Sequence, residues 1–171
     1  MVGGFLFAGH PEARKGESIL KYLGPEKAHH QFQNIGEHIF CGQMSLSIYN
    51  NANIASEQQH TLVGTALLNN RNELISLLKL NKEIGDQSII LRAFLQFGKD
   101  CLKHIHGQFA FVIYNNENNN VFGANSSTGG PRLLYYFKDG NFVASSELKC
   151  VLPFVPQRKL NKDFIIAHVQ S

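Results

Sequence analysis

The stretch GQFAFVIYNNENNNVFGAN, residues 107–125, carries the clearest structural pattern in this chain of 171 residues. Residues 109–114 are a continuous run of apolar and aromatic side chains, which is typical of a strand covered on both faces. Residues 115–120 are polar and rich in asparagine, and residues 121–124 form a second, mostly apolar run. The stretch therefore predicts a β-hairpin whose first strand lies in the interior of the protein.

Other apolar runs predict further strands around this hairpin. Gly3–Gly9 opens with glycines and continues as a short apolar run, and residues 62–68 form another. Residues 133–144 contain two more runs separated by Asp139 and Gly140, and Asp-Gly pairs favour tight turns that need positive φ. The sequence therefore predicts a second hairpin in its carboxyl-terminal third.

A weaker pattern precedes the strand at 62–68. The two histidines at residues 29–30 are predicted to lie in a solvated loop. Residues 39–41 are apolar, and Leu46 and Ile48 alternate with polar side chains, which indicates two short strand pieces.

Two amphipathic helices are predicted before the asparagine-rich hairpin. The first covers residues 71–80 and places three leucines on one face, namely Leu74, Leu77 and Leu78. The second begins at Asp86, whose carboxylate is suited to cap the start of a helix, and ends near His104. Further helices are predicted at residues 16–23 and 160–169.

The order of these elements predicts a single domain of the α+β class. Hairpins give antiparallel sheets, and continuous apolar strands require cover on both faces of each sheet. A four-layer α/β/β/α sandwich meets that requirement. An ordinary two-layer α+β domain is also compatible with the pattern.

Composition and charge exclude several classes of function. Hydrophobic residues make up 43% and charged residues 17% of the chain, which is typical of a globular domain. The formal net charge is only +3 and no dense stripe of lysine and arginine occurs, so nucleic-acid binding is not predicted. No apolar run is long enough to span a membrane, and no basic leader precedes residues 5–8, which predicts a cytoplasmic protein.

The cysteines and histidines predict neither a disulfide nor a metal centre. Cys41, Cys101 and Cys150 are far apart in the sequence, so they are expected to be buried free thiols. His104 and His106 are spaced so that both could face one side of an extended segment, but no third ligand is near in sequence. We therefore predict no metal site in this chain.

Three segments, taken in order, carry a family resemblance. Residues 64–74 read GTALLNNRNEL, residues 97–111 read FGKDCLKHIHGQFAF, and residues 129–149 read GGPRLLYYFKDGNFVASSELK. Their order and spacing resemble the N-terminal glutaminase domain of asparagine synthetases. The resemblance implies the N-terminal-nucleophile fold, an α/β/β/α sandwich, which agrees with the pattern of predicted elements.

The residues that perform catalysis in that family are replaced here. The family has a mature N-terminal cysteine, whose thiolate attacks the glutamine side-chain amide with its own α-amino group as base. In this chain Val2 stands at that position, and its side chain has no nucleophilic atom. Ser45 stands where a family arginine grips the glutamine α-carboxylate. The resemblance therefore implies a domain that has lost glutamine hydrolysis.

The rest of the implied substrate pocket is also altered. A family Asn-Gly-Glu triplet supplies the oxyanion hole, and the corresponding region here keeps only the glycine. Asp86 matches the family aspartate that receives the substrate α-amino group, although a role as helix cap explains it equally simply. The implied degenerate pocket consists of Val2, Ser45, Val63, Gly64, Thr65 and Asp86.

These departures are similar to those of beta-lactam synthetases and lasso-peptide cyclases, which keep the sandwich without the cysteine. In such ligases a second domain activates a carboxylate with ATP and closes it on an amine. The pyrophosphate loop SGGxDS of that domain does not occur in this chain. We therefore expect residues 1–157 to form the glutaminase-like domain and residues 158–171 to begin a linker toward a synthetase domain or subunit.

The resemblance also indicates partners and leaves two alternatives. ATP and Mg²⁺ would be held by the synthetase partner, and a peptide substrate and a second copy of the chain are further candidates. One alternative is a free-standing interaction protein that docks through the former active face. The other is an active amidotransferase with a displaced nucleophile, which would require Cys41, Cys101 or Cys150 to reach the cleft near Val2.

Overall fold

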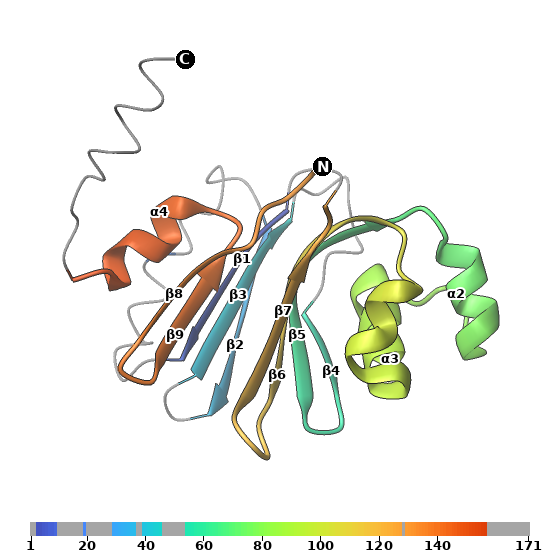
Figure 1. The fold of residues 1–171 in the computed structure, drawn as a ribbon, viewed down its shortest axis with the longest axis horizontal. Helices are drawn as coiled ribbons and strands as arrows, with labels where there is room; N and C mark the ends of the chain where they lie inside the picture. The colour runs from blue at the N-terminus through green and yellow to red at the C-terminus, as the bar shows by residue number, and fades with distance from the viewer. Residues whose placement is uncertain are drawn as a thin grey trace.

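Two antiparallel sheets pack face to face between two layers of helix (Figure 1). The computed structural model describes residues 3–9, 19, 29–36, 39–45, 54–127 and 129–156. One short helix lies on the outer face of the first sheet, and two longer helices lie on the outer side of the second (Figure 1). This arrangement confirms the predicted α+β class and its four-layer α/β/β/α form.

The first sheet has five strands in the order β2-β3-β1-β9-β8. Its strands are β1 (Gly3–Gly9), β2 (His29–Gly36), β3 (Ile39–Ser45), β8 (Leu134–Lys138) and β9 (Asn141–Ser145). The second sheet has four strands in the order β4-β5-β6-β7. Its strands are β4 (Ala55–Glu57), β5 (His60–Leu68), β6 (Gly107–Asn115) and β7 (Asn120–Asn125).

The helices follow the strands that they cover. They are α2 (Arg71–Leu78), α3 (Asp86–Phe97), the 3-10 helix η2 (Gly98–Lys103), α4 (Leu148–Val151) and the 3-10 helix η3 (Leu152–Phe154). Helix α3 packs on β4 and β5, and α4 packs on β8 and β9. Helix α2 packs on α3, so it lies farther from the sheets (Figure 1).

Strand β6 explains why its sequence is apolar without interruption. Phe109 and Phe111 face the helices and pack with the buried residues of α3, whereas Ala110 and Val112 face the five-stranded sheet. Both faces of β6 are therefore covered, as the sequence predicts. Phe111 is fully buried, and burial of a side chain of this size contributes about 2–3 kcal/mol of transfer free energy.

The polar stretch at 29–36 is a strand, so the predicted loop at His29 and His30 is wrong. Strand β2 pairs antiparallel with β3 and forms one edge of its sheet. Residues 31–34 are exposed, because an edge strand with one uncovered face needs few apolar side chains. The polar residues that led to the predicted loop belong to an edge strand.

The first predicted strand piece, residues 39–41, lies in β3, which extends to Ser45. Its pairing with β1 runs without a break from Ile39 to Ser45. Leu46, Ile48 and the predicted helix at 160–169 lie outside the described residues. In the predicted helix at 16–23 only Ile19 is described, and it is helical and buried.

The two amphipathic helices are shorter than predicted. Lys79 adopts a left-handed conformation with φ of 54° and ends α2, and Leu77 is exposed while Ile75 is buried in its place. Gly98 has φ of 58°, which ends α3 at Phe97, and the chain continues as η2 instead of the predicted helix to His104.

Candidate functional site

The start of β1 fixes the position of the predicted pocket. Val2 lies outside the described residues, and the first described residue of β1, Gly3, pairs with Ser45 at the end of β3. The backbone register therefore places Ser45 beside the start of β1. The other predicted pocket residues come from β5 and α3.

Val63 does not offer a side chain to a ligand. It is buried between the two sheets, in a cluster that contains Phe7 and Val112. This valine fills the core, and its apolar side chain cannot supply the amide that the family asparagine offers to the oxyanion.

Gly64 lies where the backbones of β5 and β6 approach each other closely. A Cβ at this position would lie 2.4 Å from Ala110 O and 2.5 Å from Phe111 Cα, both backbone atoms of β6. Only glycine fits without moving the strands apart. This packing requirement explains the glycine without any catalytic duty.

The peptide groups of Gly64 are held by two buried glutamines. The Gly64 N–H donates to Gln43 Oε1 of β3 at 3.4 Å, and Gln87 Nε2 of α3 donates to the Gly64 carbonyl oxygen at 3.3 Å. Strand β4 pairs with β5 only as far as Leu62, so these side chains bond to a part of β5 that β4 does not cover. Gly64 N–H is thus already engaged within the protein.

Three buried polar atoms near Gly64 have no hydrogen-bond partner among the described residues. They are Gln43 Nε2, Thr65 Oγ1 and Gln87 Oε1. Each belongs to a residue that is at most 3% exposed. The cluster presents a donor, an acceptor and a hydroxyl, all uncharged, beside the predicted pocket.

Sequence analysis does not identify Gln43 or Gln87 as site residues. Both look like ordinary polar positions, since Gln43 interrupts an apolar strand and Gln87 follows the first residue of a helix. The one available signal is a glutamine inside the apolar run of β3, because a buried amide needs a partner.

Asp86 is tied to neighbouring protein groups. The Leu68 N–H donates to Asp86 Oδ2 at 3.2 Å, and Arg71 Nε donates to Asp86 Oδ1 at 3.0 Å. The helix cap is Gly85 and makes no side-chain capping bond, so the predicted N-cap role of Asp86 is wrong. Asp86 is the first residue of α3, and its carboxylate joins the end of β5 to the start of α2.

Arg71 also closes the connection between the two helices. Besides its ion pair with Asp86, its guanidinium donates to the carbonyl oxygens of Lys82 and Ile84. One arginine therefore binds a carboxylate and two backbone carbonyls. The carboxylate that the resemblance assigns to a substrate amine is instead neutralised by an internal cation.

The three cysteines are buried free thiols, as predicted. Desolvation raises the pKa of Cys41 to about 12, and it also raises the pKa of Cys101 and Cys150, each to about 11. Thiols with such pKa values carry almost no thiolate at neutral pH. Cys41 lies in the cluster between the sheets. Cys101 lies on η2 in the cluster under the helices of the second sheet, and Cys150 lies on α4 in the cluster that joins this helix to the first sheet.

Metal ligands do not gather in the described part of the chain. No three His, Cys, Asp or Glu side chains there are close enough to hold a metal ion. His104 instead stacks on Phe97, with ring centroids 4.4 Å apart. In the same part of the chain, no helix combines the length and hydropathy that crossing a membrane demands.

Comparison with known proteins places these observations in a family. Residues 50–153 match the family described as glutamine amidotransferase domain. An asparagine synthetase (glutamine-hydrolyzing) 2 from Methanocaldococcus jannaschii is 32% identical over 97 residues, which is 54% of this chain and 19% of that protein. An asparagine synthetase (glutamine-hydrolyzing) 3 from Bacillus subtilis is 25% identical over 97 residues, which is 54% of this chain and 16% of that protein.

A solved structure supports the fold. A glutamine phosphoribosylpyrophosphate amidotransferase from B. subtilis, complexed with ADP and GMP, matches with a TM-score of 0.62 at 18% identity. The match covers 86% of this chain and 42% of that protein. This chain spans less than a quarter of the length of the two synthetases, and the family match covers more than half of this chain. The chain therefore belongs to the glutamine amidotransferase domain family.

Proposed function

We propose that this chain is a glutamine amidotransferase domain that no longer hydrolyses glutamine and that supports an ATP-dependent, amide-forming synthetase. The observation that carries the proposal is the internal engagement of the groups that would bind glutamine. Asp86 bonds to Arg71 and to Leu68 N–H, and both peptide groups of Gly64 bond to buried glutamines. Val2 in place of a nucleophile points the same way.

The displaced-nucleophile alternative receives no support from the thiols. A cysteine nucleophile needs thiolate at working pH and access to substrate. Cys41, Cys101 and Cys150 are each fully buried, and burial raises the pKa of all three.

The proposed partner is a synthetase domain or subunit that binds ATP and Mg²⁺. Both synthetases similar to this chain are several times longer than the matched region. We place the chain with the beta-lactam synthetase and lasso-peptide cyclase branch, in which the product is a cyclic amide. The domain would then brace the synthetase while ammonia transfer is no longer used.

Ammonia release from glutamine tests the loss of hydrolysis. The wild-type chain and a Val2→Cys variant are assayed beside the B. subtilis asparagine synthetase as the active control, with removal of Met1 checked by mass spectrometry. We expect both chains to release ammonia no faster than the blank, because Asp86 and Gly64 remain engaged within the protein. Glutamine turnover by Val2→Cys alone would contradict our interpretation of the pocket. Turnover by the wild-type chain would overturn the proposal itself.

Co-purification tests the partnership. The coding sequence downstream of this chain is expressed together with it, and the mixture is examined for co-elution and for ATP-dependent formation of AMP or ADP. We expect a segment or a separate chain carrying an SGGxDS motif to co-elute and to depend on this domain for stability. A monomeric chain with no such downstream sequence would favour the free-standing interaction protein.

A further inference from the structure

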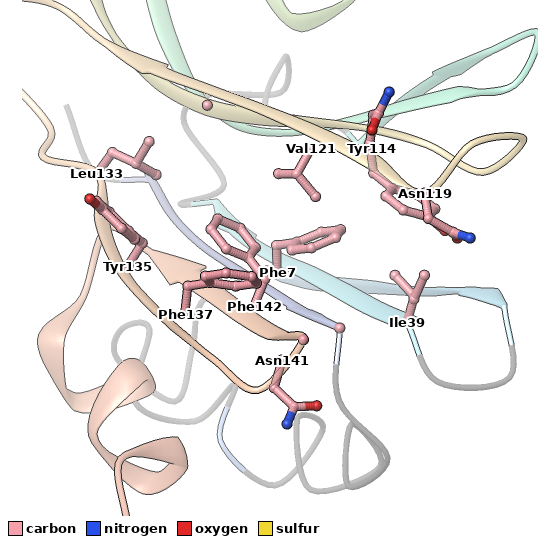
Figure 2. A pocket seen from close by; sticks show the side chains of 14 residues that line it. Phe7, Ile39, Tyr114, Asn119, Val121, Leu133, Tyr135, Phe137, Asn141 and Phe142 are labelled. Carbon is pink, nitrogen blue, oxygen red and sulfur yellow. The ribbon is translucent and has the colours of Figure 1, made fainter.

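A second cavity opens at the end of the sandwich opposite the predicted pocket. It has a volume of about 720 Å³ and lies between the two sheets, near the β6–β7 and β8–β9 turns (Figures 1 and 2). Gly9, the last residue of β1, lines it. Since strands rise about 3.3 Å per residue, this end lies about 20 Å from Gly3. The Gly9 end of the cavity is therefore distant from the start of β1.

Aromatic rings form one wall of this cavity. The ring of Phe142 contacts the rings of Phe7, Tyr135 and Phe137, at centroid distances of 5.9, 6.3 and 6.5 Å. Figure 2 shows Phe7, Phe137 and Phe142 gathered on one side, with Val121 of β7 facing them across the opening. The rings belong to the five-stranded sheet and the opposite wall to the four-stranded sheet.

Two of these rings, both on the edge strand β8, are largely exposed. Tyr135 and Phe137 alternate along β8 with Leu134 and Tyr136, which pack toward α4, so both face the inner side of the sandwich. Yet Tyr135 is 68% and Phe137 is 65% exposed, whereas Phe7 on the same face is 2% exposed. Large apolar side chains left open inside a concave site are typical of ligand pockets.

The remaining lining is uncharged. No Asp, Glu, Lys or Arg is among the described residues that line the cavity. Three asparagines, Asn119, Asn120 and Asn141, also line it, and Figure 2 shows the Asn141 side chain directed away from the aromatic rings. Asn119 Oδ1 accepts a hydrogen bond from Tyr114 Oη at 2.5 Å, which fixes one of these amides in place. A charged ligand would lose its hydration here without gaining a partner of opposite charge.

We propose that this cavity binds an uncharged, aromatic small molecule, whose rings pack on Tyr135, Phe137 and Phe142. Three features define this ligand class. The cavity volume lies in the range of small-molecule sites, which is about 300–1,000 Å³. The wall is aromatic, which favours flat ring systems. The lining without charge selects against ionised compounds.

Two related dyes test the proposal on the full chain. N-phenyl-naphthylamine is uncharged and aromatic, and anilinonaphthalene sulfonate shares its skeleton but carries a sulfonate. Emission is followed while each dye is titrated, and the absence of tryptophan keeps background emission low. We expect saturable binding of the uncharged dye with one site per chain, at least about tenfold tighter than the sulfonate. No saturable binding, or equal affinity for both dyes, would overturn the proposal.

Variants locate the bound dye. Tyr135→Ser and Phe137→Ser each remove an exposed ring, so both should fold, and each should weaken binding by about five- to tenfold. The matched control is Phe32→Ser, because Phe32 is 57% exposed on β2 at the opposite edge of the same sheet. The control should bind within about twofold of wild type. Loss of binding in the control, with the other two variants unchanged, would place the dye elsewhere.

Sedimentation of the same variants tests the other occupant, a second copy of the chain. If the cavity is a small-molecule site, the oligomeric state of wild type and Phe137→Ser is the same at every protein concentration used. A wild-type dimer that dissociates in Phe137→Ser, and that binds dye only when dissociated, would show that the rings form a subunit interface and would refute the small-molecule proposal.

Discussion

Replacing Gly64 by alanine should destabilise the protein far more than an ordinary Gly→Ala change. The added Cβ would lie 2.4 Å from Ala110 O and 2.5 Å from Phe111 Cα. Ordinary contacts need about 3.4 Å or more, so β5 and β6 must separate by about 1 Å. Flexible side chains cannot relieve this contact, because the two atoms belong to the backbone of the neighbouring strand.

The expected loss of unfolding free energy comes from the core packing and the hydrogen bonds that this strand separation disturbs. Overpacking in a well-packed core costs about 1–3 kcal/mol. The hydrogen bonds of Gly64 with Gln43 and Gln87 contribute about 1 kcal/mol each and lengthen when β5 moves. The expected loss is about 3–5 kcal/mol of unfolding free energy, which lowers the Tm by about 10 °C for a chain of this length.

Urea unfolding, followed by far-ultraviolet circular dichroism, measures this loss. The matched control is Gly98→Ala, because Gly98 has φ of 58° and no atom within 4 Å of an added Cβ. It carries only the strain of a positive-φ backbone conformation (φ 58°, ψ −137°), about 1–3 kcal/mol. If Gly64→Ala loses no more stability than Gly98→Ala, the close approach of the strands is not what requires glycine here.

Three further outcomes follow from the buried groups. The three thiols should resist alkylation by iodoacetamide near neutral pH in the folded chain and react fully in denaturant; rapid labelling of a native thiol would show an accessible nucleophile. Folding raises the pKa of Cys41, so above about pH 8.5 the folded state retains a proton that the unfolded chain releases. The free energy of unfolding should therefore fall as the pH rises from about 8.5. Urea midpoints should show a less steep fall for Cys41→Ala than for wild type. Asp86→Ala should lower the free energy of unfolding in urea by about 2 kcal/mol, because it leaves the Leu68 N–H without its acceptor. Asp86→Asn keeps that hydrogen bond and should lower it by about 1 kcal/mol. Equal losses in the two variants would show that this hydrogen bond contributes little.

The sequence predicts best those strands whose apolar side chains indicate which faces of the strand are buried. Strand β6 is apolar on both faces because helices cover one face and a sheet covers the other, so its pattern indicates a strand buried on both sides. The turn at Asp139 and Gly140 is likewise local, since both residues adopt positive φ. Strand β2 is missed because an exposed edge strand has the composition of a loop.

The site is predicted less completely than the fold, because its contacts join distant segments. The resemblance assigns Gly64 and Asp86 to one pocket, and in the structure Gly64 lies on β5 while Asp86, the first residue of α3, bonds to the end of β5. The partners of these residues depend on tertiary geometry. Gln43 is 21 residues from Gly64, and Arg71 is 15 residues from Asp86, so no short motif reveals either pair.

The side chains of Gln43, Gln87 and Asp86 form hydrogen bonds with β5, and these bonds also affect pairing of β5 with strands of other chains. A backbone edge with vacant N–H and C=O groups recruits strands from neighbouring chains and seeds aggregation. Gln43 and Gln87 form hydrogen bonds with the N–H and C=O of Gly64, and Asp86 accepts one from the Leu68 N–H. Both Gly64 and Leu68 lie in the part of β5 that does not pair with β4. Two amides and one carboxylate therefore satisfy edge groups of β5 at Gly64 and Leu68, which leaves fewer vacant groups there for a strand from another chain.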